Sequence, residues 1–235
     1  MQKLFRRCLA LGIFLGLTAP AMGQLLVVSA PLLAQVESTH GAEAQQRVAR
    51  WQALMTENAN DDELRKLELV NRFINRVPYV SDLKNWGRLD YWATPLELLS
   101  SNGGDCEDYA IAKYFSLTAM GVPAARLQIT YAISAERNEP HMVLAYLATP
   151  GAEPLILDNL RDNITAASQR HDLSPLFGFN STGVWLAQTR GRGAAAIPAE
   201  RINLWADLIA RMSVEAKQVA ALDKELRITT ANNAR

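Results

Sequence analysis

Cysteine and histidine are scarce in this sequence of 235 residues, which has two of the first and three of the second. A zinc centre needs a compact set of such ligands, so the sequence gives no basis for one. The formal net charge is zero and no segment forms a basic stripe, which argues against a nucleic-acid-binding protein. Internal repeats and low-complexity tracts are also missing. With 49% hydrophobic and 20% charged residues, the composition indicates one globular domain.

The first 23 residues have the pattern of a secretory signal peptide. Three cations precede an apolar run, and the small residues at 21–23 offer a cleavage site. We therefore expect export with residues 1–23 removed. Retention as an uncleaved anchor is the alternative, because residues 25–33 are again largely apolar. Cleavage would remove Cys8 and leave Cys106 as the one cysteine, so that no internal disulfide could form.

Cys106 lies in the segment Gly103-Gly104-Asp105-Cys106-Glu107-Asp108, which an apolar pattern of helical period follows. The two glycines predict a turn, and the pattern predicts a helix with Cys106 in its first turn. Unpaired N–H groups at a helix start favour the thiolate, the nucleophilic form of cysteine. The alternative is a cysteine packed as a small apolar residue, but the flanking carboxylates argue against an apolar pocket.

Hydrophobic periodicity divides the chain into helices, then strands, then a last helix. Helical spacing predicts helices at 40–55, 62–76, 106–120 and 198–227, and Thr94-Pro95-Leu96-Glu97 has the form of a capping box. Period-two alternation predicts strands at 127–133, 141–147, 154–158 and 183–188. Residues 78–93 are irregular and aromatic, with rings that line a groove or pack under the helices, and residues 159–182 are rich in loop formers. This order predicts an α+β fold with helices packed on an antiparallel sheet.

A cysteine nucleophile needs a base and a group that orients the base. The exported chain offers His40, His141 and His171. If the strands on either side of Thr149-Pro150 form a hairpin, His141 is directly opposite Asp158, and directly opposed residues share a face of the sheet. In that register Asp158 would orient the His141 ring so that its other nitrogen faces Cys106, which makes the three residues candidates for a catalytic triad, whereas a bulge in the hairpin would break the register. The Cys106 N–H is a natural oxyanion donor, and Asn102 or residues 86–92 are candidates for the second.

Asp105, Glu107 and Asp108 place three carboxylates around this cysteine. Capping of the helix could occupy one or two of them, since acidic residues suit a helix N-terminus. Unpaired, their charge would raise the pKa of the thiol. Carboxylate oxygens suit calcium, so the three residues predict a calcium site. Because no twelve-residue EF-hand loop is present, the remaining ligands must come from elsewhere in the fold.

These residues, in this order, resemble the bacterial transglutaminase-like cysteine proteinases. The similarity is carried by Gly-Gly-Asp-Cys106-Glu-Asp-Tyr-Ala, Glu-Pro-His141-Met-Val-Leu, Leu-Ile-Leu-Asp158-Asn and the segment 86–95. It implies a papain-like, transglutaminase-like domain over residues 40–225, with N-terminal helices at 40–77, a catalytic core at 94–190 and a C-terminal helix at 198–227. It also implies the triad above and a need for calcium beside the cysteine. Asp105 and Glu107 match that calcium motif, and Asp108 matches it less closely.

The resemblance further implies a function that composition and periodicity do not give. A protein of this kind is a periplasmic endopeptidase that cleaves the N-terminal region of a large surface adhesin, within a di-alanine motif, and so controls biofilm attachment. An inner-membrane receptor for cyclic di-GMP is the expected inhibitory partner. Two alternatives stay open. A transglutaminase would pass the acyl group to a lysine amine, and a non-catalytic periplasmic binding module would use the fold without the chemistry.

Overall fold

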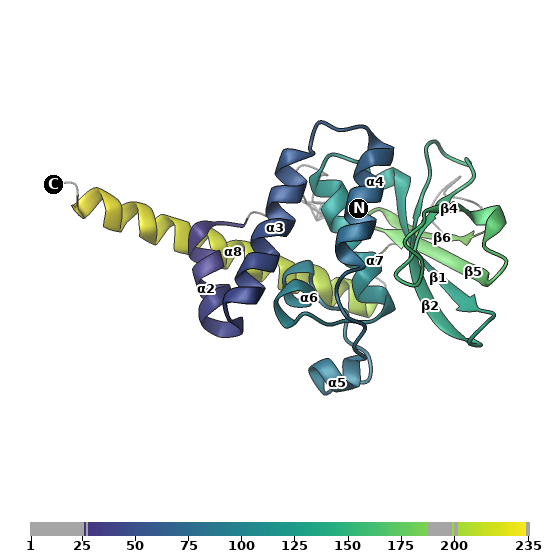
Figure 1. The fold of residues 1–235 in the computed structure, drawn as a ribbon, viewed down its shortest axis with the longest axis horizontal. Coiled ribbons are helices and arrows are strands. Elements are labelled where there is room, and N and C mark those ends of the chain that lie inside the picture. The colour runs from purple at the N-terminus through teal and green to yellow at the C-terminus, as the bar shows by residue number, and fades with distance from the viewer. Residues whose placement is uncertain (1–25, 27, 188–198, 200–201, 234–235) are drawn as a thin grey trace, which may run out of the picture.

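The protein combines helices with a six-stranded antiparallel sheet of order β4-β3-β2-β1-β5-β6 (Figure 1). The computed structural model describes residues 26, 28–187, 199 and 202–233. The helices are α2 (Ala30–His40), α3 (Ala42–Glu57), α4 (Glu63–Ile74), α5 (Asp82–Trp86), α6 (Pro95–Ser101), α7 (Cys106–Ala119) and α8 (Asn203–Asn233), with 3-10 turns η2 (Ala124–Arg126) and η3 (Ala167–Gln169). The strands are β1 (Leu127–Ser134), β2 (Glu139–Tyr146), β3 (Leu155–Leu157), β4 (Thr165–Ala166), β5 (Leu173–Asn180) and β6 (Gly183–Leu186). The expected α+β class is confirmed.

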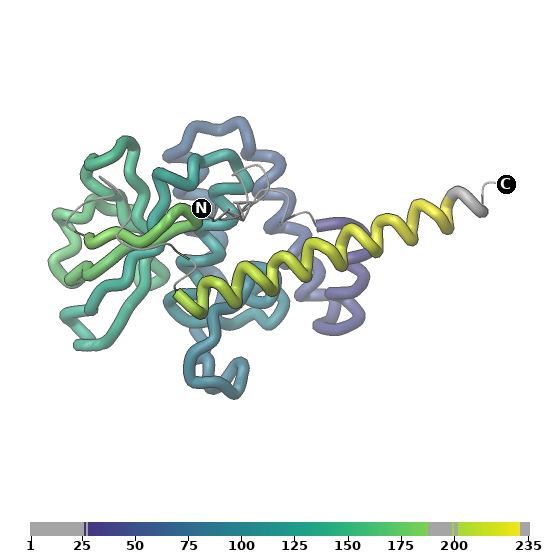
Figure 2. The backbone as a smooth tube through the Cα atoms, turned by 180° about the vertical axis from the view of Figure 1, so that it is seen from behind, coloured from purple at the N-terminus to yellow at the C-terminus, as the bar shows by residue number. Residues whose placement is uncertain are grey.

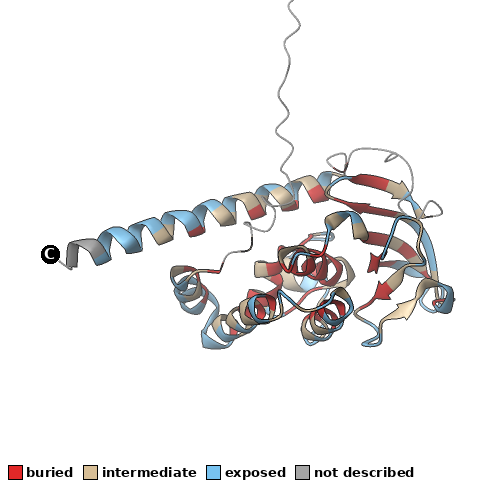
Figure 3. Cartoon of the chain, turned by 90° about the horizontal axis from the view of Figure 1, so that it is seen from above, coloured by how far each residue is buried: buried red, intermediate tan, exposed pale blue. Residues whose placement is uncertain are grey.

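Helix α7 is the central element of the helical layer. It packs against β1 and β2 on one side and against α4 and α6 on the other. Figure 3 shows the buried residues gathered between the helices and the sheet. The indole N–H of Trp51, on α3, donates to the hydroxyl of Ser116 on α7 at 2.8 Å within this core. Because α7 is enclosed on all these sides, its first residue, Cys106, has a fixed position relative to the sheet.

Local sequence signals fix where α6 and α7 begin. The Thr94 hydroxyl accepts the Glu97 N–H at 3.1 Å, while the Glu97 carboxylate accepts the Thr94 N–H at 2.8 Å, which is the predicted capping box. Helix α7 begins at Cys106, as the turn-then-helix pattern predicts. Asp108 stabilises this start, because its carboxylate accepts the Asp105 N–H at 3.2 Å.

The two longest elements that were not predicted are α2 and β5. Helix α2 precedes the expected helix at 40–55, and Pro31 lies in its first turn, where a missing N–H costs nothing. Strand β5 runs through the segment expected to be loop. It contains Pro175, and its register with β1 shifts between Tyr131 and Ala132, so a bulge accommodates a residue that normally argues against a strand.

The irregular segment 78–93 contains the short helix α5, which projects from the body of the molecule (Figure 1). Its aromatic residues have different environments. Trp92 is buried and stacks on Phe179, with ring centroids 5.5 Å apart. Trp86 is half-buried and packs against Tyr91 at 4.8 Å. Trp86, Tyr91 and Trp92 therefore belong to the packed layer, although Trp92 also borders the cleft described below, whereas Tyr79 is exposed.

Helix α8 starts beside the sheet, crosses the helical layer and extends beyond it (Figure 2). It spans Asn203–Asn233 instead of the predicted 198–227. Trp205, Leu208 and Met212 anchor its first half in the core, whereas its outer half is mostly exposed. Among the helices of the described ranges, none is both long enough and apolar enough to cross a membrane. The expected signal peptide at 1–23 lies outside the described residues.

Candidate active site

Cys106 occupies the first position of α7 and is partly buried. The chain reaches it through a tightly packed turn. Gly104 forms a parallel bridge with Tyr79, and its carbonyl accepts the Val80 N–H at 2.9 Å. A Cβ at Gly104 would stand 2.5 Å from Cδ1 of Leu98, so no larger residue fits there. These contacts hold the segment before the helix, and with it the direction of the cysteine side chain.

His141 and Asp158 meet beside this helix start. The two side chains are buried, and Nε2 of His141 lies 2.9 Å from Oδ1 of Asp158. Because Nε2 is bonded to the carboxylate, Nδ1 is the ring nitrogen left to act on a thiol. Cys106 and His141 line the same cleft, of about 480 Å³, together with Met142. The structure therefore brings the three predicted catalytic residues to one place.

The strand register that achieves this differs from the one predicted. The expected hairpin would pair Leu144 with Leu155, whereas the observed partner of Leu144 is Leu157. Asp158 follows the end of β3 and is not directly opposite His141. The displacement is two residues, and because side chains alternate with a period of two, both residues stay on the same face. Diagonal neighbours on one face are still within reach of a histidine and an aspartate.

Asp158 is ionised despite its burial. Burial alone would raise the pKa of its carboxyl, but hydrogen bonds from His141, from the Leu160 N–H and from Arg170 hold that pKa well below its usual range. An ionised carboxylate can accept the imidazole N–H and fix the ring tautomer. His171, the other candidate in the loop, is exposed, and His40 ends α2 on the helical side of the fold.

The pKa of the Cys106 thiol is shifted in the opposite direction, toward the protonated form. Its Sγ lies 3.1 Å from Oε2 of Glu107, and burial, followed by the charge of Glu107, raises the pKa of the thiol far above its usual range. The Met142 N–H opposes this shift. The helix start alone therefore does not suffice to generate a thiolate, and a positive charge near Glu107 would be needed.

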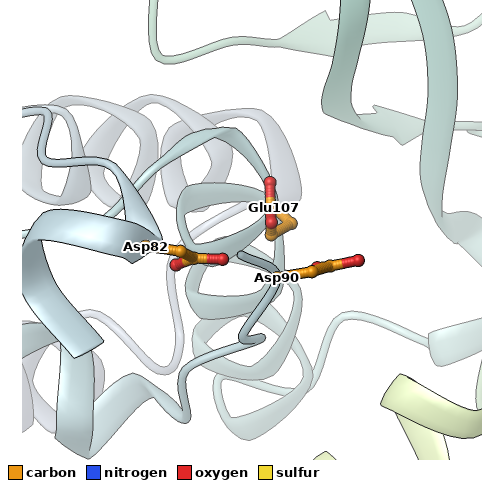
Figure 4. A group of neighbouring side chains, drawn as sticks. All are labelled: Asp82, Asp90 and Glu107. Atoms are coloured by element: carbon orange, nitrogen blue, oxygen red, sulfur yellow. The ribbon is translucent and has the colours of Figure 1, made fainter. Parts of the chain in front are cut away.

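A cluster of carboxylates surrounds the cysteine and includes two residues that the sequence did not reveal. Ligand oxygens of Asp82, Asp90 and Glu107 lie within 4.8 Å of one another, and those of Asp82, Asp105 and Asp108 form a second such group. Figure 4 shows Asp82, Asp90 and Glu107 gathered at the start of α7. Asp82 and Asp90 come from the irregular segment, where no local motif distinguishes them from surface acids.

Burial raises the pKa of three carboxyl groups in this cluster, those of Asp82, Asp105 and Glu107. Burial raises the pKa of Asp82 to about 6 and that of Glu107 to about 8, with the charge of Asp105 adding to both shifts. Oδ1 of Asp82 and Oδ1 of Asp105 are buried and have no hydrogen-bond partner within the described part of the chain. Unsatisfied, closely spaced carboxylate oxygens are the donor set that calcium requires. These residues therefore fit a calcium ion.

Asp108 differs from the other predicted ligands. It is fully buried, and its two oxygens accept the backbone N–H groups of Ala93, at 2.7 Å, and Asp105, at 3.2 Å. The bond from Ala93 ties the start of α7 to the segment that leads into α6, and the bond from Asp105 closes the first turn of α7. The contacts favour the capping alternative for Asp108, while Asp105 and Glu107 face the cluster.

A cysteine at a helix start, sharing a cleft with a buried histidine–aspartate pair, defines the class of thiol-dependent acyl-transfer enzymes. The chain belongs to the bacterial transglutaminase-like cysteine proteinases, whose family model matches residues 33–172. It is a cysteine protease by this membership, and the expectation drawn from the sequence motifs is confirmed at the level of the family.

Solved structures of LapG from Legionella pneumophila have the same fold. One is 38% identical, with a TM-score of 0.68, and the match covers 79% of this chain and 97% of that one. The calcium-bound form of that protein is 39% identical, with a TM-score of 0.69 and coverages of 79% and 99%. The EGTA-treated form is 38% identical, with a TM-score of 0.70 and coverages of 79% and 98%. Comparison with curated protein sequences gives no match.

Proposed function

We propose that this protein is a periplasmic, calcium-dependent cysteine endopeptidase that cleaves the N-terminal region of a large surface adhesin and so controls biofilm attachment. The observation that carries the proposal is the hydrogen bond to the buried Asp158 from His141, which lines the same cleft as Cys106. The signal-like segment at 1–23 supports export. The similarity to LapG supports the peptidase chemistry.

The reaction would proceed by acyl transfer. The Cys106 thiolate attacks the carbonyl carbon of the scissile peptide bond, and the Cys106 N–H at the start of α7 donates to the developing oxyanion. His141, protonated at Nδ1, gives its proton to the leaving amine, and a thioester links the substrate to Cys106. Water then attacks the thioester with Nδ1 of His141 as base, releasing the acid and the free thiol. Asp158 keeps the imidazole oriented throughout.

Asp82, Asp90, Asp105 and Glu107 are the residues that would hold calcium. Calcium bound there supplies positive charge beside the cysteine. Glu107, whose pKa burial raises to about 8, would then lose its proton to the solvent, and its unfavourable charge on the thiol would be balanced. Asp108 would contribute indirectly, by fixing the backbone of Asp105.

The cleft has two chemically different walls. Acidic residues form one side, and Tyr131, Phe177 and Met142 contribute an apolar side. An extended peptide with small side chains at the scissile bond would let its backbone approach Cys106 between these walls. This arrangement suits the di-alanine site expected of the adhesin. The inhibitory partner in this proposal is an inner-membrane receptor that senses cyclic di-GMP and holds the enzyme in the periplasm.

Purified protein incubated with N-terminal adhesin fragments from the same cell tests the function directly. We expect discrete cleavage in calcium and none for Cys106→Ala, a mild steric change at an already enclosed helix start. Intact fragments after incubation with wild-type protein would contradict the endopeptidase proposal and favour a binding module. Ammonia release from a glutamine peptide, with amine incorporation in place of hydrolysis, would instead identify a transglutaminase.

A further inference from the structure

Asp158 lies just beyond β3, which ends at Leu157, so the strand pairing does not fix the orientation of its carboxylate. Its two carboxylate oxygens are bonded to different groups. Oδ1 faces His141 at 2.9 Å and accepts the Leu160 N–H at 3.0 Å, whereas Oδ2 accepts a hydrogen bond from Nη2 of Arg170 at 2.6 Å. Rotation of this carboxylate would break the contact to the imidazole, and the bond to Arg170 opposes that rotation.

Arg170 is itself held rigidly. Its Nε and Nη2 atoms donate to the two oxygens of Asp172 at 2.9 and 2.8 Å, so the planar guanidinium is fixed as a fork. The Arg170 side chain is 2% exposed, the Asp158 side chain 0% and the Asp172 side chain 14%. Water competes little with such contacts, and charge-assisted hydrogen bonds are strong in this environment.

The sheet topology explains how a residue outside the motifs reaches this position. Strand β4 pairs with β3, and the turn η3 that follows β4 brings Arg170 back under the end of β3. The Arg170 carbonyl accepts the Leu173 N–H at 3.1 Å, which fixes the turn against the start of β5. No short sequence signal marks this arginine, because its partner lies twelve residues earlier in the chain.

We propose that Arg170 is a positioning residue that, braced by Asp172, holds Asp158 in the orientation that fixes the His141 imidazole. This inference rests on the proposed function for its purpose, but the contacts stand without it. A second cation, Lys113 on α7, is fully buried near Asp158, and burial lowers its pKa to about 7. A guanidinium stays charged throughout the neutral pH range, so of these two cations Arg170 is the one that always balances the charge of the Asp158 carboxylate.

The test uses two measurements that need no substrate. Proton–nitrogen NMR of the full chain reports the His141 Nε2–H, which we expect as a slowly exchanging, downfield resonance, assigned by its loss in His141→Gln. The rate at which iodoacetamide alkylates Cys106, measured at one neutral pH in calcium, reports how effectively the His141 imidazole activates the thiol. In Arg170→Gln we expect the resonance to be lost and the alkylation rate to fall by roughly tenfold to a hundredfold, as for other partners that orient a functional imidazole.

Arg126→Gln is the matched control. Arg126 also pairs with a carboxylate, that of Glu63, at 2.7 and 2.8 Å. It lies just before the first residue of β1, whereas His141 pairs with the other end of that strand. We expect wild-type resonance and alkylation rate in this variant. Arg170→Lys keeps the charge without the planar fork and should restore only part of both signals.

Asp172→Asn covers the possibility that Arg170→Gln does not fold, since Asp172 is less buried. It should weaken both signals in the same direction but less strongly. A folded Arg170→Gln with the wild-type resonance and alkylation rate would overturn the proposal, and so would an unchanged Asp172→Asn if Arg170→Gln cannot be purified. Neither result depends on adhesin cleavage. The proposed function could therefore be disproved while this inference holds, and this inference could be disproved while the proposed function holds.

Discussion

Gly104 lies directly against Asp108: a Cβ at position 104 would stand 2.6 Å from Oδ2 of Asp108. That oxygen accepts the Asp105 N–H and so closes the first turn of α7. The close approach joins the turn before the cysteine to the helix that carries it. The geometry of the nucleophile thus depends on a residue with no side chain.

Gly104→Ala should therefore disturb both stability and activity. The added methyl group meets Leu98 and Asp108 inside a packed core, and overpacking of this kind costs about 1–3 kcal/mol. Urea unfolding monitored by tryptophan fluorescence measures the loss. Gly178→Ala is the control, because its nearest neighbour is the flexible end of Gln128 at 3.1 Å. Equal stability of the two variants would show that the turn is not constrained as described.

Asp158→Asn should lower the turnover number strongly while leaving the Michaelis constant near its wild-type value. The amide keeps the shape of the carboxylate but holds the imidazole in the wrong tautomer, and in a well-studied triad such a change costs on the order of 10⁴. Steady-state cleavage of the adhesin fragment gives both constants. Activity close to wild type in this variant would remove Asp158 from the catalytic group.

Calcium binding should distinguish the carboxylates that face the cluster from the one that caps the helix. Asp82→Asn and Glu107→Gln should each weaken calcium affinity by roughly tenfold or more, because each removes a charged ligand oxygen. Asp108→Asn should instead lower the thermal midpoint, since its oxygens are bonded to Ala93 and Asp105. Isothermal titration and thermal unfolding separate the two effects.

Removal of the metal gives a further check on the same site. EGTA should abolish cleavage, and added calcium should restore it far better than magnesium, which demands a smaller and more regular oxygen shell. Full activity in EGTA, with no heat of calcium binding, would contradict the calcium site and show that the carboxylates have a purely structural role.

The calcium-free protein should become less stable as the pH rises from about 5 to 8. Burial raises the pKa of Glu107 to about 8 in the folded protein, so in this range the folded state binds more protons than the unfolded state, and stability falls with increasing pH. Glu107→Gln removes the titration and should flatten the dependence. Thermal midpoints in EGTA across this range measure it, and a wild-type midpoint that rises with pH would contradict the assignment.

The sequence by itself determined the elements that depend on near neighbours in the chain. Thr94 and Glu97 cap one helix, the two glycines turn the chain into Cys106, and period-two alternation marks β1 and β2. The same alternation brought His141 and Asp158 to one face even though the register was displaced by two residues, because an even displacement preserves the face.

Only the tertiary structure decided which distant groups complete the site. Asp82 and Asp90 lie in an irregular segment whose path is set by packing, and Arg170 reaches Asp158 through the pairing of β3 and β4. Strand β5 forms despite Pro175 because pairing with β1 and β6 outweighs the local preference. Contacts of this kind join residues far apart in sequence, and local propensity carries no information about them.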